Sequence, residues 1–222
     1  MRHTGMVKCI MNTLLGNIVA MLAEYIEDAK PVAEADICRF VGERNIFLRE
    51  DHLLFLMKFG GKVDGRLRMF HRYGGDFDFD FFKSAYVENF SDMRVPDGNT
   101  YFGTTYASGS LCVDCSSGKI YVYDEGDRYG LVHESIDGFA LSCLVPIYAE
   151  KAFSNKKAEL NVDLEFFNEF RVKNKKNKIV GANFFEIEYV DIDKPEAFAE
   201  YYWIGQKLVV LYIATQSIVT YG

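Results

Sequence analysis

Hydrophobic residues change their spacing partway along the chain, and this change predicts helices first and strands afterwards. Up to Phe59 they recur every three or four positions, the period of an amphipathic helix. The spacing predicts helices over residues 12–29, 34–41 and 50–59. Gly42 is expected to stop the second helix, and Gly60–Gly61 the third. We expect the third helix to be deeply buried, because apolar side chains cover most of its surface.

Beyond Gly61 the pattern alternates between apolar and polar residues, as it does in β-strands. A strand is predicted over 66–73 and another over 76–81. In the second strand Asp76, Asp78 and Asp80 would share one face, with phenylalanines on the other. A short helix is expected over 82–90. The next strands form a meander over 101–105, 110–115 and 119–124, joined by turns at 97–98 and 116–118.

The pattern returns to a helix over 134–148 and then alternates again. Asn161 is expected to cap a helix that continues to Val172, followed by a basic loop over 173–178. Strands are predicted over 183–190, 201–204 and 207–213, with a helix as the alternative for the last of these apolar runs. The chain therefore reads as an α+β fold, with N-terminal helices on a mostly antiparallel mixed sheet and a closing helix. We expect one domain over 1–150, and a C-terminal α/β elaboration over 151–222 that packs on the same core.

The charge of the chain is acidic and concentrated in one region. The 222 residues carry a net charge of −7, whereas a general nucleic-acid binder is basic. Residues 76–137 hold twelve acidic and four basic residues, a net of −8. Such a region favours a basic protein partner through electrostatic steering. The alternative is a solvated surface that keeps the protein soluble.

Residue types that carry chemistry form no recognisable catalytic or metal-binding motif. Cys112 and Cys115 have the spacing of metal and redox sites, but no second cysteine pair completes a zinc site. Core packing is the better interpretation of these thiols. The aspartates of 76–80 lack the glycine turns and distal glutamate of a calcium loop. We therefore expect no catalytic residue, no metal ligand and no cofactor.

The N-terminal segment is interpreted as a packed helix and not as a signal peptide. Asn12 and Asn17 interrupt its apolar run, and the helical pattern continues into acidic residues. No run in the sequence approaches the ~20 apolar residues of a membrane span. The odd number of cysteines, five, suits a reducing compartment. These features together predict a cytoplasmic protein without a membrane partner.

Several short segments resemble the SMI1/KNR4 family, also called the SUKH superfamily. Leu48, Phe55, Leu56 and Gly60–Gly61 match its Leu-Pro-x-x-Tyr-x-x-Phe-Leu-x-x-x-Gly-Gly segment, although Arg49 replaces the proline. Three later segments resemble its central strands and its closing helix: Phe102–Gly103 with 110–114, 118–121, and 136–144. The resemblance covers roughly residues 30–150, and residues 151–222 lie outside it.

The resemblance implies an α+β domain that binds a protein and catalyses no reaction. Many bacterial members resemble immunity proteins, which neutralise a cognate toxin, often a nuclease, by stoichiometric binding. Others are regulatory or scaffold proteins, which is the alternative function here. A hydrolase with an unrecognised site is a third possibility that ranks below both.

The acidic region supplies the candidate binding residues. A nuclease needs a basic surface to hold nucleic acid, and an acidic inhibitor can occupy that surface. Tyrosines are candidate anchors, because interface hot spots favour them. The predicted partner-binding residues are Asp76, Asp78, Asp80, Tyr121, Tyr123, Asp124, Glu125, Asp127 and Tyr129.

Overall fold

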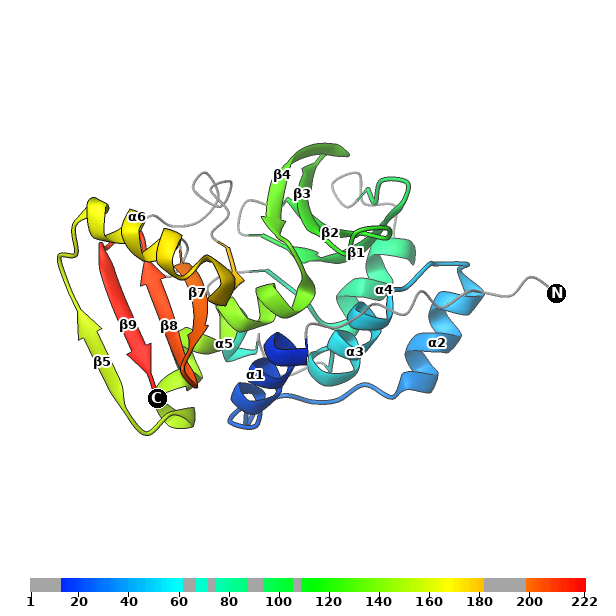
Figure 1. Ribbon diagram of the computed structural model, residues 1–222. Coiled ribbons are helices and arrows are strands. Elements are labelled where there is room, and N and C mark those ends of the chain that lie inside the picture. The colour runs from blue at the N-terminus through cyan, green and yellow to red at the C-terminus, as the bar shows by residue number, and fades with distance from the viewer. Residues whose placement is uncertain (1–12, 62–66, 72–74, 88–93, 106–108, 182–198) are drawn as a thin grey trace. The chain divides into compact units, whose positions relative to one another are not determined.

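The chain has an α+β fold, with helices ahead of antiparallel sheet, as the hydrophobic pattern predicts. The computed structural model describes residues 13–61, 67–71, 75–87, 94–105, 109–181 and 199–222 (Figure 1). Two compact units divide the chain: one contains Glu27–Asp137, and the other combines Asn17–Ile26 with Gly138–Gly222.

The first unit places three helices before a four-stranded meander. The helices are α2 (Glu34–Glu43), α3 (Glu50–Phe59) and α4 (Phe79–Val87), with a 3-10 turn η1 (Arg68–Phe70) between the last two. The strands are β1 (Asn99–Thr104), β2 (Ser110–Asp114), β3 (Ile120–Asp124) and β4 (Asp127–His133). Each strand pairs antiparallel with the next, in the order β1-β2-β3-β4.

Apolar side chains from all three helices and from β1 form the core of the first unit. Ile37 of α2, Leu56 of α3, Phe82 of α4 and Tyr101 of β1 are each at most 1% exposed and belong to one cluster. The expected burial of α3 is confirmed in part. Its Leu53, Phe55, Leu56 and Phe59 are buried, but Leu54 is 42% exposed.

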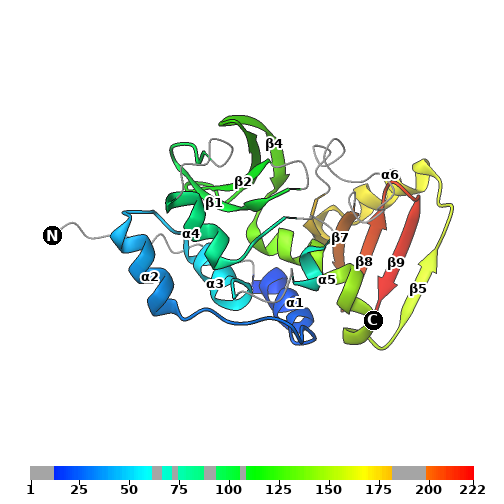
Figure 2. The ribbon, with the colours of Figure 1, turned by 180° about the vertical axis from the view of Figure 1, so that it is seen from behind.

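The second unit is a five-stranded antiparallel sheet with helices. Its elements are α1 (Thr13–Ala23) from Asn17 onward, α5 (Ile136–Ala152) from Gly138 onward, β5 (Lys156–Glu159), α6 (Leu164–Lys173), the 3-10 turn η3 (Lys175–Asn177), β6 (Lys178–Val180), β7 (Ala199–Ile204), β8 (Lys207–Tyr212) and β9 (Ser217–Tyr221). The strand order is β5-β9-β8-β7-β6. Helix α6 lies over the sheet (Figure 1, Figure 2) and buries Phe167 against Tyr202, Leu211 and Ile218.

The strands predicted over 66–73 and 76–81 are wrong for the described residues. Arg68–Phe70 form the turn η1, and Phe79 already begins α4. The carboxylate of Asp78 accepts a hydrogen bond from the Phe81 backbone N–H at 2.9 Å, which caps the first turn of that helix. Capping therefore decides the local structure where the alternating pattern predicted a strand.

Other boundaries differ more modestly from the predicted ones. Gly42 lies inside α2 and does not stop it. Asp163, and not Asn161, caps α6, and its carboxylate accepts from the Phe166 N–H. The expected strand over 183–190 lies outside the described residues. Strands β7 and β8 are confirmed, whereas β4, β5, β6 and β9 were not predicted.

The division between the units falls at Asp137 and Gly138, earlier than the expected boundary at residue 150. Helix α5, expected to close the first domain, belongs to the second unit from Gly138 onward. Phe153, just past its end, stacks near Trp203 and Tyr221 of the sheet, with ring centroids 6.4 and 6.0 Å away. Residues 17–26, also expected in the first domain, join the second unit as well.

Candidate protein-binding surface

The turn between β3 and β4 places three acidic side chains in solvent. Asp124 pairs in register with Asp127, and Glu125 and Gly126 connect them. We call residues 124–127 the acidic loop. Glu125 and Gly126 have φ values of 49° and 95°, the left-handed conformation of a two-residue type I′ hairpin turn. Asp124, Glu125 and Asp127 are all exposed.

The β3–β4 hairpin curls so that the acidic loop meets the segment before β1. The register between these strands shifts at Ile120/Tyr121 and again at Val122/Tyr123. Such irregularities bend a strand and increase its twist. The Tyr123 hydroxyl donates to the Asn99 side-chain oxygen at 3.2 Å, which ties β3 to the start of β1.

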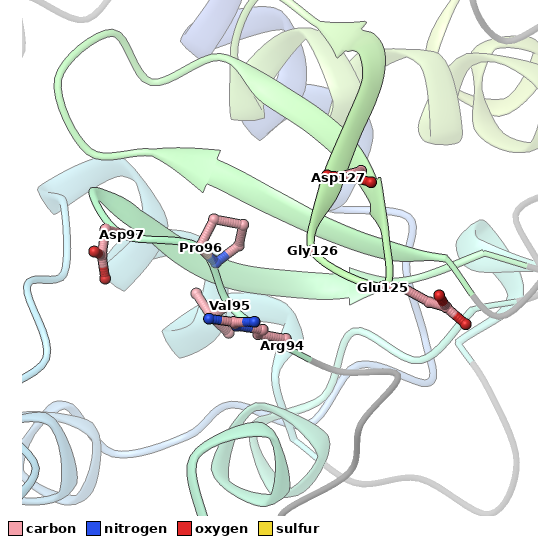
Figure 3. A pocket seen from close by; sticks show the side chains of 7 residues that line it. All are labelled: Arg94, Val95, Pro96, Asp97, Glu125, Gly126 and Asp127. Atoms are coloured by element: carbon pink, nitrogen blue, oxygen red, sulfur yellow. The ribbon is translucent and has the colours of Figure 1, made fainter.

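A pocket of about 310 Å³ lies between the acidic loop and residues 94–97 (Figure 3). Glu125, Gly126 and Asp127 line one part of it, and Arg94 to Asp97 line the rest. Figure 3 shows Arg94 and Asp97 on the segment that leads into β1, and Glu125 and Asp127 on the turn of the hairpin. The lining thus combines three carboxylates with one guanidinium group. A pocket of this charge suits a cationic side chain better than an anion.

The tyrosines of the hairpin differ in exposure. Tyr129 is 49% exposed and available for contact. The Tyr121 ring lies under the Arg128 guanidinium at 4.9 Å, a cation–π arrangement. Tyr123 is only 6% exposed, and burial raises the pKa of its hydroxyl. The structure therefore places Tyr123 in the interior, where it supports the hairpin and does not serve as a surface anchor.

The aspartates Asp76, Asp78 and Asp80 do not form the acidic strand face that we expected. The backbone N–H of Asp76 donates to the Thr104 hydroxyl at 2.9 Å, and Asp78 caps α4. Asp80 lies within α4 and forms an ion pair with Lys83 at 2.6 Å. Asp78 and Asp80 thus have local roles in the first turn of α4, and the backbone of Asp76 is held to the end of β1. The acidic loop, and not this segment, is therefore the candidate surface.

Three residues of the surface were missed in the sequence: Arg94, Asp97 and Arg128. Arg94 and Asp97 precede β1 and meet the loop only because the hairpin curls. No local pattern signals that contact. Arg128 follows the loop directly, and its position next to a predicted tyrosine was the one available signal.

The buried thiol of Cys112 lies in an environment that suppresses its reactivity. Burial, followed by the neighbouring Cys115, raises the pKa of the Cys112 thiol to about 12, so the nucleophilic thiolate does not form near neutral pH. No set of three or more histidine, cysteine or carboxylate side chains is arranged to hold a metal ion within the described ranges. None of the described helices is both long and apolar enough to cross a membrane.

Comparison with known proteins identifies no relative: no family model, curated protein or solved structure matches the chain. The resemblance to the SMI1/KNR4 family thus rests on its short motifs alone.

Proposed function

We propose that this protein is a binding domain without catalytic activity, which holds a basic protein partner through the acidic loop. The specific role that we propose is an immunity protein of SMI1/KNR4 type, which neutralises a cognate toxin by stoichiometric binding. The observation that carries the proposal is the exposure of Asp124, Glu125 and Asp127 on one turn, next to the exposed ring of Tyr129.

The acidic loop differs from the neighbouring turn, in which an acidic residue serves the fold. Between β2 and β3 the carboxylate of Asp114 accepts hydrogen bonds from the backbone and hydroxyl groups of Ser116 and Ser117. Chiefly the Ser116 hydroxyl, with these other donors, lowers the pKa of Asp114 to about 2. The loop carboxylates project into solvent instead, where they attract a basic surface over a Debye length of about 10 Å.

The conformation of Glu125 also favours a role beyond folding. Type I′ turns strongly prefer Asn-Gly or Asp-Gly, because both central residues need a positive φ. Glutamate at this position costs of order 1 kcal/mol relative to a residue that tolerates the left-handed region. The turn thus carries a charge at a conformational cost, although the fold itself does not need that charge.

The pocket beside the loop gives the surface a recognition element. A lysine or arginine of the partner would be attracted by the net negative charge that Asp97, Glu125 and Asp127 give to this region. Tyr129 and the Tyr121–Arg128 pair would contact the surrounding surface as amphipathic anchors. A toxin that holds nucleic acid presents basic side chains of this kind.

The proposal is tested by association kinetics with the product of the adjacent gene. Both proteins are purified, and the association rate is measured at low and high salt for the wild type, Glu125→Lys and Asp127→Lys. Each loop variant is expected to slow association about tenfold or more at low salt, with a smaller effect at high salt. Glu43→Lys is the matched control, since it makes the same charge change at an exposed position of α2 in the same unit.

Two outcomes would contradict parts of the proposal. Equal association rates for the loop variants and the control would exclude the acidic loop as the docking surface. If the chain binds no neighbouring gene product but captures a housekeeping protein, the scaffold function replaces the immunity function.

A further inference from the structure

Within the part of the chain that the structure describes, strand β5 leaves one edge of the five-stranded sheet open. It pairs with β9 on one side, and it is the terminal strand of the order β5-β9-β8-β7-β6. All four of its residues, Lys156 to Glu159, are exposed, and the following Leu160 is 71% exposed. An edge strand of this kind offers unpaired backbone groups to another strand.

The hydrogen-bond pattern fixes which backbone groups point outward. Asn155 and Gly222 exchange both backbone hydrogen bonds, at 2.7 and 3.0 Å. In an antiparallel pair these bonded positions alternate, so Lys157 and Glu159 also direct their backbone groups toward β9. The N–H and C=O groups of Lys156, Ala158 and Leu160 therefore face the open edge.

The charges along this edge are balanced, which removes the usual protection against pairing. Edge strands commonly carry lysines that repel an approaching strand. Here the Lys156 ammonium forms an ion pair with Glu150 of α5, and the Lys157 ammonium pairs with Glu159 at 2.6 Å. Each lysine thus has a carboxylate partner, and the edge carries no net charge once Glu150 of α5 is counted with the strand.

We propose that β5 pairs antiparallel with β5 of a second copy of this chain, so that the two sheets join across a two-fold axis. Outward-facing positions must pair with each other, which allows the two-fold axis to pass at Lys157, Ala158 or Glu159. An axis at Lys157 or at Glu159 places two like charges directly opposite each other, which is repulsive. An axis at Ala158 pairs Lys157 with Glu159 of the second copy, and the small alanine side chains meet at the axis.

The register centred on Ala158 is complementary on both faces of the sheet. Lys157 and Glu159 lie on the face covered by α6 and form an ion pair within one chain. In the dimer, Lys157 of each copy pairs with Glu159 of the other copy instead. On the opposite face, the aliphatic stem of Lys156 lies against the exposed Leu160 of the other copy. The pairing needs no rearrangement of the sheet, because the strand already has the required conformation.

Sedimentation velocity of the full chain tests the dimer, from about 1 to about 100 µM. The wild type is expected to change from monomer to dimer within this range. Glu159→Lys places Lys157 opposite a lysine and is expected to weaken the dimer roughly tenfold. The double variant Lys157→Glu/Glu159→Lys restores opposite charges across the axis and is expected to recover the dimer.

A backbone variant provides an independent test. Ala158→Pro removes an outward-facing N–H, which an edge strand tolerates because that group makes no bond within the sheet. It is expected to leave a monomer whose circular dichroism matches the wild type. A wild type that stays monomeric throughout the range would overturn the proposal. So would a dimer whose affinity is unchanged in both Glu159→Lys and a folded Ala158→Pro.

Discussion

Arg49 and Asp51 form a bidentate ion pair, in which Nε and Nη2 of the guanidinium lie 3.0 and 3.1 Å from the two carboxylate oxygens. The side chains are 7% and 13% exposed. The guanidinium also donates to the Cys115 carbonyl at 3.2 Å, so it joins the start of α3 to the turn after β2.

Replacing Arg49 is expected to destabilise the fold strongly. Arg49→Met removes the cation and leaves the Asp51 carboxylate unpaired at a largely buried position. The expected loss is about 3 kcal/mol of unfolding free energy, measured by urea denaturation. Arg39→Met is the control, since Arg39 forms an exposed pair with Asp36 and its loss should cost less than about 0.5 kcal/mol. Equal losses would mean that the buried pair contributes no more than the surface pair.

His52 makes the stability depend on pH. Its ring is fully buried between Phe82 and Phe102, and neither nitrogen has a hydrogen-bond partner among the described residues. Burial, followed by the charge of Arg49, lowers the pKa from 6.5 to about 3. Below pH 6.5 the unfolded chain therefore binds a proton that the folded chain excludes. The contribution of His52 to the unfolding free energy is fully present above pH 6.5, and the unfolding free energy falls by about 2.5 kcal/mol by about pH 4.5.

The variant His52→Leu tests this assignment. It is expected to remove that part of the pH dependence and to keep or raise the stability near pH 7.5, because it relieves two unpaired polar atoms. Urea denaturation across the pH range measures both effects. His71→Leu, at an exposed position, is the control. If His52→Leu loses as much unfolding free energy at acidic pH as the wild type does, then other groups cause the pH dependence.

Glu125→Asn is expected to raise the stability and to weaken binding. Asparagine tolerates the left-handed conformation of this turn, so the gain in unfolding free energy is about 0.5–1 kcal/mol. Loss of the charge slows association with the basic partner. Asp127→Asn removes the same charge without the conformational relief, and it should slow association without stabilising the fold. A Glu125→Asn protein with unchanged stability would show that the turn carries no strain at this residue.

Glu200 of β7 is hydrogen-bonded to three donors, one each from α6, β6 and β7. Arg171 donates at 2.9 Å, Lys178 at 2.7 Å and the Tyr202 hydroxyl at 2.9 Å. Burial alone raises the pKa of Glu200, but these hydrogen bonds outweigh it and the pKa is lowered. The network therefore stabilises the fold at neutral pH and loses its contribution as the pH falls through the lowered pKa.

Removing that charge is expected to destabilise the second unit. Glu200→Gln should cost about 2–3 kcal/mol at neutral pH and should reduce the acid sensitivity. Chemical denaturation at neutral and acidic pH measures both. Glu169→Gln, an exposed glutamate of α6, should change the stability by less than about 0.5 kcal/mol. A loss that is equal at both pH values would exclude the charge as its cause.

Elements with a strong local pattern were predictable from the sequence. Helix α3 has the predicted bounds, and the β1–β3 meander with its turn at Ser116–Gly118 is confirmed. These elements are determined by side-chain periodicity and turn residues within a few positions. Strand β4 was missed because five of its seven residues, Asp127 to Leu131, are exposed or half-buried, so no alternation appears.

The segment around Asp78 shows how one local rule overrides another. Alternation of Asp and Phe predicted a strand, but Phe79 and Phe82 have helical spacing and both are buried. The Asp78 cap supplies the hydrogen bond that starts the helix. The sequence could not predict that Arg94 lies beside the acidic loop, because this proximity depends on two register shifts in the β3–β4 hairpin.

The position of β9 in the second sheet has a consequence for synthesis on the ribosome. Strand β5 has β9 as its neighbour, yet β9 is made roughly 60 residues later. During that interval the β5 segment has no strand on either side. The charged side chains of Lys156, Lys157 and Glu159 then keep the segment hydrated until β9 emerges. Only after β9 pairs with it does the segment become a strand with one edge left over, which is the edge to which we assign the dimer.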